Sequence, residues 1–329
     1  MPERRRLLAV LGALLVGAAV AVLLSLRAGE LPLAFDDVMG ALFRSGEGHA
    51  STVILQLRLP RAVAAFACGG LLATAGALMQ VLLRNPLADP YILGISGGAA
   101  VGALGAITLG AATFWIDASA FAGALAAMLV VFGLAHGDGS WTQTRLLLTG
   151  VIVAAGCGAA VSLMLALAPD TRVMSMLFWM MGDASAAARP WPALVVLALA
   201  LVAVMPFARD LNVLARGELS ARALGVRVGH LRVALYVLAS LLTATSVTLV
   251  GSVGFVGLVV PHLVRLVLGN DQRVLIPAAA LAGGTQLTLA DTAARTVIAP
   301  QQLPVGVLTA LIGVPVFLFL LSRGSRISR

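Results

Sequence analysis

The side chains best able to make specific polar contacts in this sequence are arginines, and five of them lie in the polar segment Arg209–Arg232. A guanidinium group binds carboxylates and phosphates through paired hydrogen bonds. The five are Arg209, Arg216, Arg222, Arg227 and Arg232, against only two acidic residues. Apolar runs of membrane-spanning length, 191–208 and 233–250, flank the segment. Because short arginine-rich loops stay on the inner side of a membrane, this pattern predicts a cytoplasmic loop over residues 209–232.

Part of this loop has helical spacing. Leu214, Glu218, Ala221 and Leu224 fall three or four positions apart, which places them on one face of a helix. Gly225 follows as a C-terminal stop. A short amphipathic helix at the membrane surface predicts a docking element for another protein.

The other residue types argue against an enzyme and against a nucleotide site in this chain. All 22 basic residues are arginine, whereas a phosphate-binding loop needs a lysine, so any ATP that drives the protein is hydrolysed by another polypeptide. No catalytic triad, paired carboxylates or metal cluster can be recognised. Cys68 and Cys157 lie in apolar stretches without metal-type spacing and are expected to be small core residues.

Composition predicts an all-α membrane protein. The chain is 60% hydrophobic and 11% charged, and its apolar runs give about ten transmembrane helices. These lie at 7–26, 58–83, 94–110, 114–134, 145–167, 191–208, 233–250, 258–268, 274–294 and 305–321. The first run is too long for a signal peptide and lacks a clear cleavage site. We expect the third span to pack closely against a neighbour through the small residues Gly98 and Gly102.

The distribution of arginines predicts the orientation. With the N-terminus and the C-terminus both cytoplasmic, fifteen of the 22 arginines fall inside and seven outside. The net charge of +8 therefore reflects topology and contact with lipid head groups, and no nucleic acid is expected as a partner.

Three arginines stand against this bias, at predicted outer ends of spans. Arg58, Arg61 and Arg295 have two interpretations: snorkelling to lipid head groups, or an outward patch that receives an acidic protein. Asp291, one turn before Arg295, is placed to pair with it. Asp291 is also the one carboxylate well inside a predicted span, although it lies toward the outer end.

Several stretches, in this order, resemble the ten-span permease subunits of type II ABC importers for vitamin B12, ferric siderophores and haem. They are RLPR (58–61), RNPLADPYILGISGGAA (84–100), TRLLLTG (144–150), FWMMGD (178–183), ARGELSARALGV (215–226), GFVGLVVPHLVR (254–265) and LPVGVLTALIGVPVF (303–317). The similarity covers residues 58–323 and is closest, in motifs, to the vitamin B12 branch.

The resemblance implies a single transmembrane permease domain over 1–329, in the inner membrane, which carries a metal chelate from the periplasm to the cytoplasm. Two copies would form the pathway. Separate ATPase subunits would hold ATP and magnesium, and this chain would bind no cofactor and no metal. The coupling element would comprise Arg216, Gly217, Glu218, Ala221, Leu224 and Gly225.

The same resemblance assigns the outer arginines and a gate. Arg58, Arg61 and Arg295 would meet glutamates of a periplasmic substrate-binding protein. Gln143 and Thr144 would narrow the inner end of the pathway, although this pair differs from the vitamin B12 branch. The alternative function is an ion-coupled secondary transporter, which would need a membrane-embedded ionisable residue, and only Asp291 offers one. An intramembrane enzyme is less well supported still.

Overall fold

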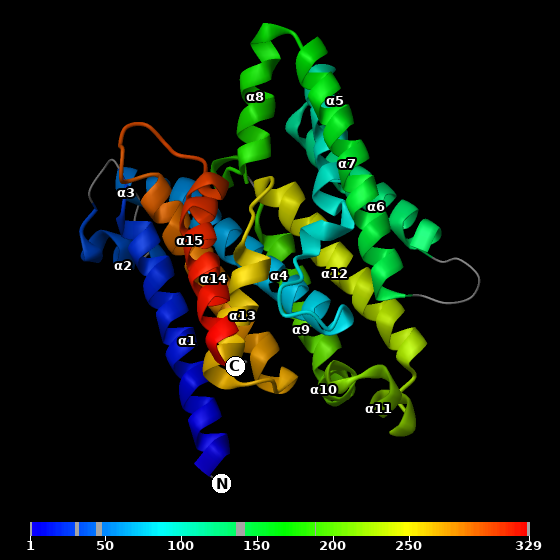
Figure 1. Cartoon of the computed structure of the whole chain (residues 1–329). Helices are drawn as coiled ribbons and strands as arrows, with labels where there is room; N and C mark the ends of the chain where they lie inside the picture. Colours follow the sequence, from blue (N-terminus) through cyan, green and yellow to red (C-terminus); the bar gives the residue numbers. More distant parts are fainter. Residues whose placement is uncertain (1, 30–32, 44–47, 136–141, 188, 328–329) are drawn as a thin grey trace.

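The chain forms a bundle of helices (Figure 1) in the computed structural model, which describes residues 2–29, 33–43, 48–135, 142–187 and 189–327. Ten helices are candidates to cross the membrane: α1 (Pro2–Arg27), α4 (Leu59–Leu82), α5 (Ile95–Thr108), α6 (Thr113–Ala135), α7 (Gln143–Leu167), α9 (Trp191–Val204), α12 (Val228–Val250), α13 (Val256–Leu268), α14 (Gln272–Ala294) and α15 (Val305–Ile327). The shorter ones are α2 (Phe35–Phe43), α3 (His49–Thr52), α8 (Asp170–Met181), α10 (Ala208–Arg216) and α11 (Glu218–Ala223).

The ten predicted spans correspond to these ten helices. Seven helical segments of the described chain are long and apolar enough to cross a membrane, and α5, α13 and the apolar part of α15 are shorter. The all-α membrane fold is therefore confirmed. Several boundaries were wrong: the helix of the second span begins at His49, α1 begins at Pro2 rather than at residue 7, and α12 begins at Val228 rather than Val233. Polar residues end an apolar run in the sequence, but a helix continues past them because its backbone hydrogen bonds are internal.

Helix α4 is the centre of the bundle. Of the apolar window in the segment His49–Leu82, 94% is buried, because α9, α12, α13 and α14 surround it. Small residues allow this close packing: Gly69 lies against the carbonyl of Gly283 on α14. The predicted close approach of the third span is also confirmed. Gly98 and Gly102 of α5 lie against the backbone of α6, where any side chain would collide with carbonyl oxygens.

Two spans are short because irregular segments precede them inside the bundle. A 3₁₀ turn, η2 (Pro90–Leu93), leads into α5, and an extended stretch over 251–254 leads into α13. The two segments contact each other: the Val253 amide donates to the Tyr91 hydroxyl at 3.0 Å, and the hydroxyls of Ser96 and Ser252 lie 3.1 Å apart. Non-helical backbone is stable at membrane depth only where protein satisfies its polar groups, as it does here.

The bundle has two distinct ends (Figure 1). One end carries α8 together with α2 and α3, and we call it the α8 end. The opposite end carries α10 and α11, and both chain termini lie toward it; we call it the α11 end. An even number of spans requires the termini to share one side. That this side is cytoplasmic remains a prediction from the arginines.

Candidate functional site

The predicted docking loop forms two short helices instead of one. The helix α10 ends at Arg216, and α11 begins at Glu218. Between them Gly217 has a φ of 134°, a conformation that a residue with a side chain rarely adopts. The predicted stop at Gly225 is confirmed: its φ is 81°, and the amides of Gly225 and Val226 donate back to the last turn of α11. The glycines therefore set the two ends of α11.

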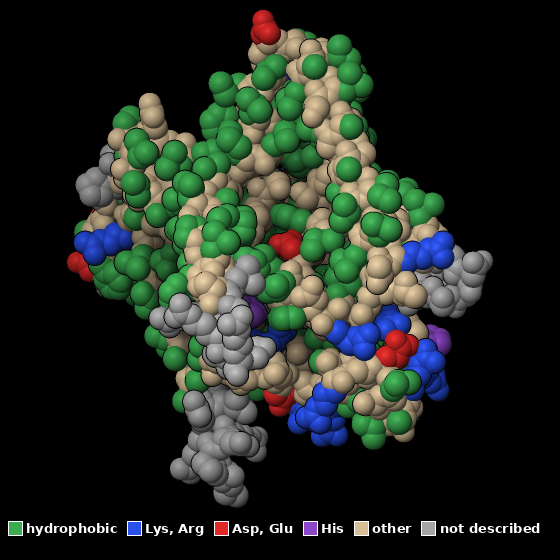
Figure 2. Space-filling model, viewed as in Figure 1, with side chains coloured by type: hydrophobic (Ala, Val, Ile, Leu, Met, Phe, Trp, Pro, Cys, Tyr) green, Lys and Arg blue, Asp and Glu red, His purple; other side chains and the backbone are tan. Residues whose placement is uncertain are grey.

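The predicted apolar face is only partly correct. Leu214 and Ala221 are buried against the bundle, as a shared face requires. Leu224, by contrast, is 71% exposed, and Leu219, which sequence reasoning missed, is 85% exposed. The break at Gly217 turns α11 relative to α10, so spacing measured across the break does not predict a common face. Two apolar side chains thus project from the α11 end, beside the arginines that gather over α10 and α11 (Figure 2).

Glu218 holds α11 against α12. Its carboxylate accepts from Arg222 at 2.7 Å, one turn along α11, and from Arg232 of α12 at 2.6 Å. Burial raises the pKa of Glu218, but the hydrogen bond from Arg222 and the charge and hydrogen bond of Arg232 together lower it by more, so the pKa lies below its ordinary value. The carboxylate is therefore ionised at neutral pH. Its role in the structure is to fix α11, rather than to present a free charge.

A cleft of about 520 Å³ lies under this element. It is lined by Arg84, Arg216, Gly217, Glu218, Leu219, Ser220 and Arg222. The cleft joins α11 to the end of α4, because Arg84 follows that helix. The surface around α11 is therefore continuous with the end of α4.

The two predicted gate residues differ in their surroundings. Gln143 bridges the first turn of α7 to the end of α4: its amide nitrogen donates to the Leu82 carbonyl at 3.1 Å, and its oxygen accepts from Arg84 at 3.1 Å. Thr144 is exposed at the same helix start. The loop before them, residues 136–141, lies outside the described residues. The structure thus places Gln143 at the α11 end, and gating by the pair remains a prediction.

Of the three arginines predicted to face outward, Arg61 and Arg295 contact Asp291 at the α8 end. Arg61 makes a bidentate pair with Asp291, with both nitrogen–oxygen distances at 2.9 Å, and also donates to Gln302 at 2.8 Å. The side chains of Arg61 and Asp291 are 11% and 1% exposed. Arg295, the predicted partner of Asp291, lies farther from it at 3.8 Å. The main ion pair therefore joins α4 to α14, across the bundle rather than along one helix.

Arg58 and Arg295 bind the end of α1. Arg58 donates to the carbonyls of Leu26 and Arg27, each at 2.9 Å. Arg295 donates to the carbonyl of Ala28 at 2.8 Å and to both oxygens of Ser25. These carbonyls end a helix, where backbone oxygens have no intrahelical donor and a cation is favourable. Both arginines are only 7% exposed, which leaves little of either side chain for a binding protein to contact. Docking through Arg58 and Arg295 stays a prediction, and this burial argues against it.

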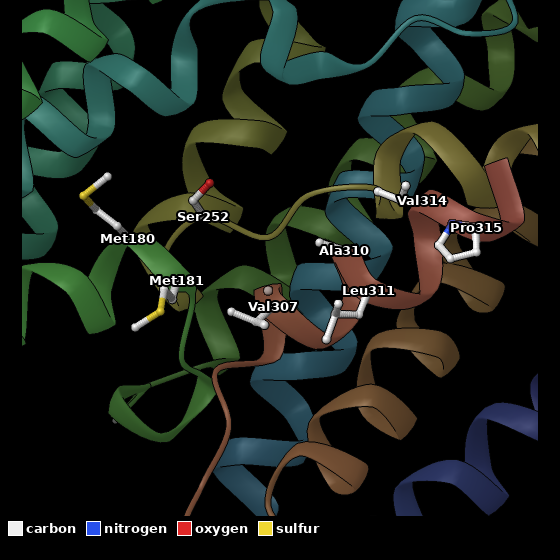
Figure 3. Close-up of a pocket in the computed structure, with 9 residues that line it drawn as sticks. Met180, Met181, Ser252, Val307, Ala310, Leu311, Val314 and Pro315 are labelled. Carbon is white, nitrogen blue, oxygen red and sulfur yellow. The ribbon is translucent and has the colours of Figure 1, made fainter. Parts of the chain in front are cut away.

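An apolar pocket of about 560 Å³ lies between α15 and the end of α8 (Figure 3). Met180 and Met181 come from the end of α8, Ser252 from the extended segment, and six further residues, including Val307, Leu311 and Pro315, from α15. Sulfur and methyl groups make up most of this wall, and Ser252 supplies its one side-chain hydroxyl. Such a surface offers few strong bonds to a passing ligand. In the sequence, the two methionines belong to the stretch FWMMGD, which contributes to the resemblance but does not by itself indicate a pocket.

Other chemistry is sparse in the part of the chain that the structure describes. No group of three or more histidine, cysteine or acidic side chains lies together there. Cys68 is buried, with its sulfur 2.8 Å from the Ser246 hydroxyl, as expected of a core residue. Cys157 is only half-buried on α7, so the same expectation was wrong for it.

Known proteins agree with this architecture. The FecCD transport family matches residues 6–323. The cobalamin import system permease protein BtuC of Halobacterium salinarum is 43% identical, over 83% of this chain and 74% of that protein. The vitamin B12 import system permease protein BtuC of Escherichia coli is 39% identical over 93% of each chain, and the hemin transport system permease protein HmuU of Yersinia pestis is 38% identical over 95% of each.

A solved structure is similar over nearly the full length. It is described as an inward-facing conformation of a candidate metal-chelate type ABC transporter, and it superposes with a TM-score of 0.82 at 30% identity. The superposition covers 96% of this chain and 99% of that one. With ten apolar helices, a projecting α10–α11 element and a family match from the first helix into the last, the chain belongs to the FecCD transport family, whose members are membrane-embedded transport permeases.

Proposed function

We propose that this chain is the permease subunit of an ATP-driven importer that carries a bulky metal chelate from the periplasm to the cytoplasm. Two copies form the pathway, and an ATPase subunit contacts the α10–α11 element of each copy at the cytoplasmic face. A periplasmic binding protein delivers the ligand to the α8 end. The chain acts as one transmembrane domain of the inner membrane and leaves ATP and magnesium to the ATPase.

The observation that carries the proposal is the form of the α10–α11 element. It projects from the bundle, exposes Leu219 and Leu224, and is fixed to α12 through Glu218 and Arg232. Exposed apolar side chains on a rigidly held helix suit insertion into a cleft of another protein. Because Glu218 joins α11 to a membrane helix, a force applied to α11 reaches the bundle directly, as rocking between inward- and outward-facing states requires.

The ligand class follows from relatives and from the apolar pocket. Relatives at 38–43% identity are named as cobalamin, vitamin B12 and hemin permeases. The pocket beside α15 presents methionine and aliphatic groups, which suits a large ligand that must pass without being held. Corrinoids, haem and ferric siderophores are all bulky metal chelates. The binding protein then provides the selectivity.

The exposed surface at the α8 end, with Arg61 at its edge, receives the binding protein in this scheme. Arg61 retains 11% exposure while it holds Asp291, and Gln302 beside it is exposed. The contributions of Arg58 and Arg295 are then to secure α1 beneath this surface. An ion-coupled transporter needs an ionisable group free to bind its ion, whereas Asp291 is bound by Arg61.

The test is reconstitution of the full complex. The tagged chain is purified with its ATPase and binding protein in proteoliposomes, and ATP hydrolysis and uptake are measured with cyanocobalamin, haemin and a ferric hydroxamate. We expect one of these, together with the binding protein, to stimulate hydrolysis and accumulate inside. Uptake that needs no ATPase, and follows an ion gradient instead, would overturn the proposal.

A further inference from the structure

A second pocket at the α11 end is lined by three arginines. Its volume is about 710 Å³, and it lies between the end of α4, the helix α10 and the turn from α13 to α14. Arg84, Arg216 and Arg265 line it, against one acidic residue, Asp271. The rest of the wall is mostly amide side chains, with Val81, Pro86 and Ala215 as its apolar members. We call this cavity the basic pocket.

Two of the three guanidinium groups have no partner in the part of the chain that the structure describes. Arg216 and Arg265 make no hydrogen bond and no ion pair there, and Arg265 is half-buried near the end of α13. Asp271 makes no ion pair with either of them in the described chain: its Oδ1 accepts from Asn212 at 2.8 Å and from the Arg273 amide at 3.1 Å, and a single carboxylate cannot balance three arginines. The basic pocket therefore holds positive charge without a matching anion.

The third arginine occupies an unfavourable backbone conformation. Arg84 has a φ of 45° and is the residue after the C-cap of α4. The amides of Arg84 and Asn85 donate back to Val81 and Gln80, the hydrogen-bond pattern in which glycine is the favoured residue at this position. An arginine at a glycine position points to a role for its side chain. That side chain lines both the basic pocket and the cleft under α11.

The frame of the basic pocket is rigid. Asn212 of α10 joins the start of α14 twice: its Nδ2 donates to Asp271, and its Oδ1 accepts from the Gln272 amide, both at 2.8 Å. The helix α10 and the α13–α14 turn are thereby held in fixed register. Their arginines are positioned before any partner arrives, which lowers the entropic cost of binding.

We propose that the basic pocket is a second ATPase contact, which receives an acidic side chain of the ATPase subunit that also contacts α11. This inference rests on the proposed function. Arg84 and Arg216 line both cavities, so a protein seated on α11 reaches the basic pocket without a gap. A carboxylate fits the pocket because guanidinium groups bind it in a planar, paired geometry.

The phosphate of an anionic lipid carries the same charge but fits the walls less well. A lipid needs an apolar channel for its acyl chains next to the phosphate, whereas amide and charged side chains form most of this cavity. An ATPase side chain needs only the charged end. The observations therefore favour protein, and lipid becomes an outcome of the test.

The key variant is Arg265→Gln, because Arg265 lines the basic pocket and not the cleft under α11. The matched control is Arg273→Gln, because Arg273 is exposed in the first turn of α14, beside the basic pocket, and lines neither cavity. Affinity for the purified ATPase is measured in nanodiscs at low and high salt, and thermal unfolding is followed in parallel. We expect Arg265→Gln to weaken binding about tenfold and to reduce its salt dependence, while Arg273→Gln binds like wild type.

A second variant separates folding from binding. Arg84→Gly suits the left-handed backbone and removes the guanidinium, so we expect thermal stability at or above that of wild type together with weaker ATPase binding. Equal ATPase affinity of Arg265→Gln and wild type would overturn the inference and leave the proposed function standing. Loss of bound phosphatidylglycerol from Arg265→Gln in native mass spectrometry, with ATPase affinity unchanged, would assign the pocket to lipid. If the wild-type chain bound no ATPase, both the second ATPase contact and the proposed function would be wrong.

Discussion

Glu218 and Arg232 form the ion pair that connects the projecting element to the membrane bundle. Arg232 Nη2 lies 2.6 Å from Glu218 Oε2, and the two residues come from different helices, α11 and α12. Arg232 is the more buried partner, with 10% of its side chain exposed against 25% for Glu218. The pair thus lies between the exposed surface that a partner contacts and the helices that line the core. If α11 moves, it must either break this ion pair or move α12 with it.

The first prediction concerns pH. Because the folded state lowers the pKa of Glu218, its ionised form stabilises the α11–α12 contact above the ordinary glutamate pKa of about 4.5. That stabilisation is lost as pH falls through the lower pKa of the folded state. We expect hydrogen exchange of the α11 amides, corrected for the intrinsic pH dependence of exchange, to accelerate in this acidic range while α12 stays protected. Glu218→Gln should exchange fast in α11 at every pH.

A control keeps this result specific. Asp210 lies in the first turn of α10 and makes no contact with α12 through an ion pair in the described chain. Asp210→Asn should therefore leave the pH dependence of α11 unchanged. If Glu218→Gln and wild type had the same pH profile, the ion pair would not be what holds α11.

The second prediction concerns the exposed leucines. Leu219 and Leu224 are 85% and 71% exposed at the α11 end, and truncating an apolar anchor at the centre of an interface costs about 1–3 kcal/mol of binding. We expect Leu219→Ala and Leu224→Ala each to weaken ATPase binding about tenfold without lowering thermal stability. Leu109→Ala is the matched control, because Leu109 is 87% exposed at the α8 end. Equal effects of all three would indicate non-specific binding.

Helices were predictable from the sequence, whereas contacts between them were not. Ten apolar runs indicate ten spans because a bilayer requires internal hydrogen bonding over a fixed length. The stop at Gly225 also followed from local chemistry. The break at Gly217 did not, because glycine is tolerated inside helices and its φ of 134° depends on how α10 and α11 pack. Leu219 was missed for the same reason, since the break changes which side chains face outward.

The charged residues show the same limit. The segment around Asp291 suggested Arg295, one turn away, as its partner, whereas Arg61 on another helix binds it more closely. Only the packing of α4 against α14 brings Arg61 there. Likewise, Arg58 and Arg295 mark the outer boundary of the membrane in the sequence, but their hydrogen bonds go to the last carbonyls of α1. Spacing along the chain carries no information about that contact.

The third prediction tests the buried charges at the α8 end. Asp291→Asn leaves Arg61 and Arg295 without their carboxylate in a site where Asp291 is 1% exposed, and breaking a buried pair in this way costs about 3–5 kcal/mol. We expect a marked fall in the unfolding temperature in detergent. Asp36→Asn, an exposed carboxylate on α2 at the same end, is the control and should unfold like wild type. If Asp291→Asn were as stable as wild type, Asp291 would not be what holds Arg61 and Arg295, and both would be available to a binding protein.

Docking itself is tested separately with Arg61→Gln. If Arg61 receives a carboxylate of the binding protein, affinity for that protein falls, and falls more at low salt than at high salt, because charge attraction is screened. The unfolding temperature of the same sample shows how much of the loss comes from the Asp291 contact. Binding-protein affinity that stays at the wild-type value would limit Arg61 to the pairing with Asp291.

The last prediction concerns Asn212, which joins α10 to the start of α14 through two hydrogen bonds of 2.8 Å. Asn212→Leu keeps the size of the side chain but removes both bonds, while α11, Glu218 and the exposed leucines stay as they are. We therefore expect the ATPase to bind through α11, although less tightly because the basic pocket loses its fixed frame, and to move at least several-fold less ligand for each ATP hydrolysed, since movement of α10 no longer carries α14 with it. Asn270→Leu makes the same chemical change in the neighbouring turn, where the side chain makes no such bond in the described chain, and should keep uptake near wild type. The measurement is the ratio of ligand transported to ATP hydrolysed in proteoliposomes. A ratio unchanged in Asn212→Leu would mean that the coupling motion reaches the pathway through Glu218 and α12 alone.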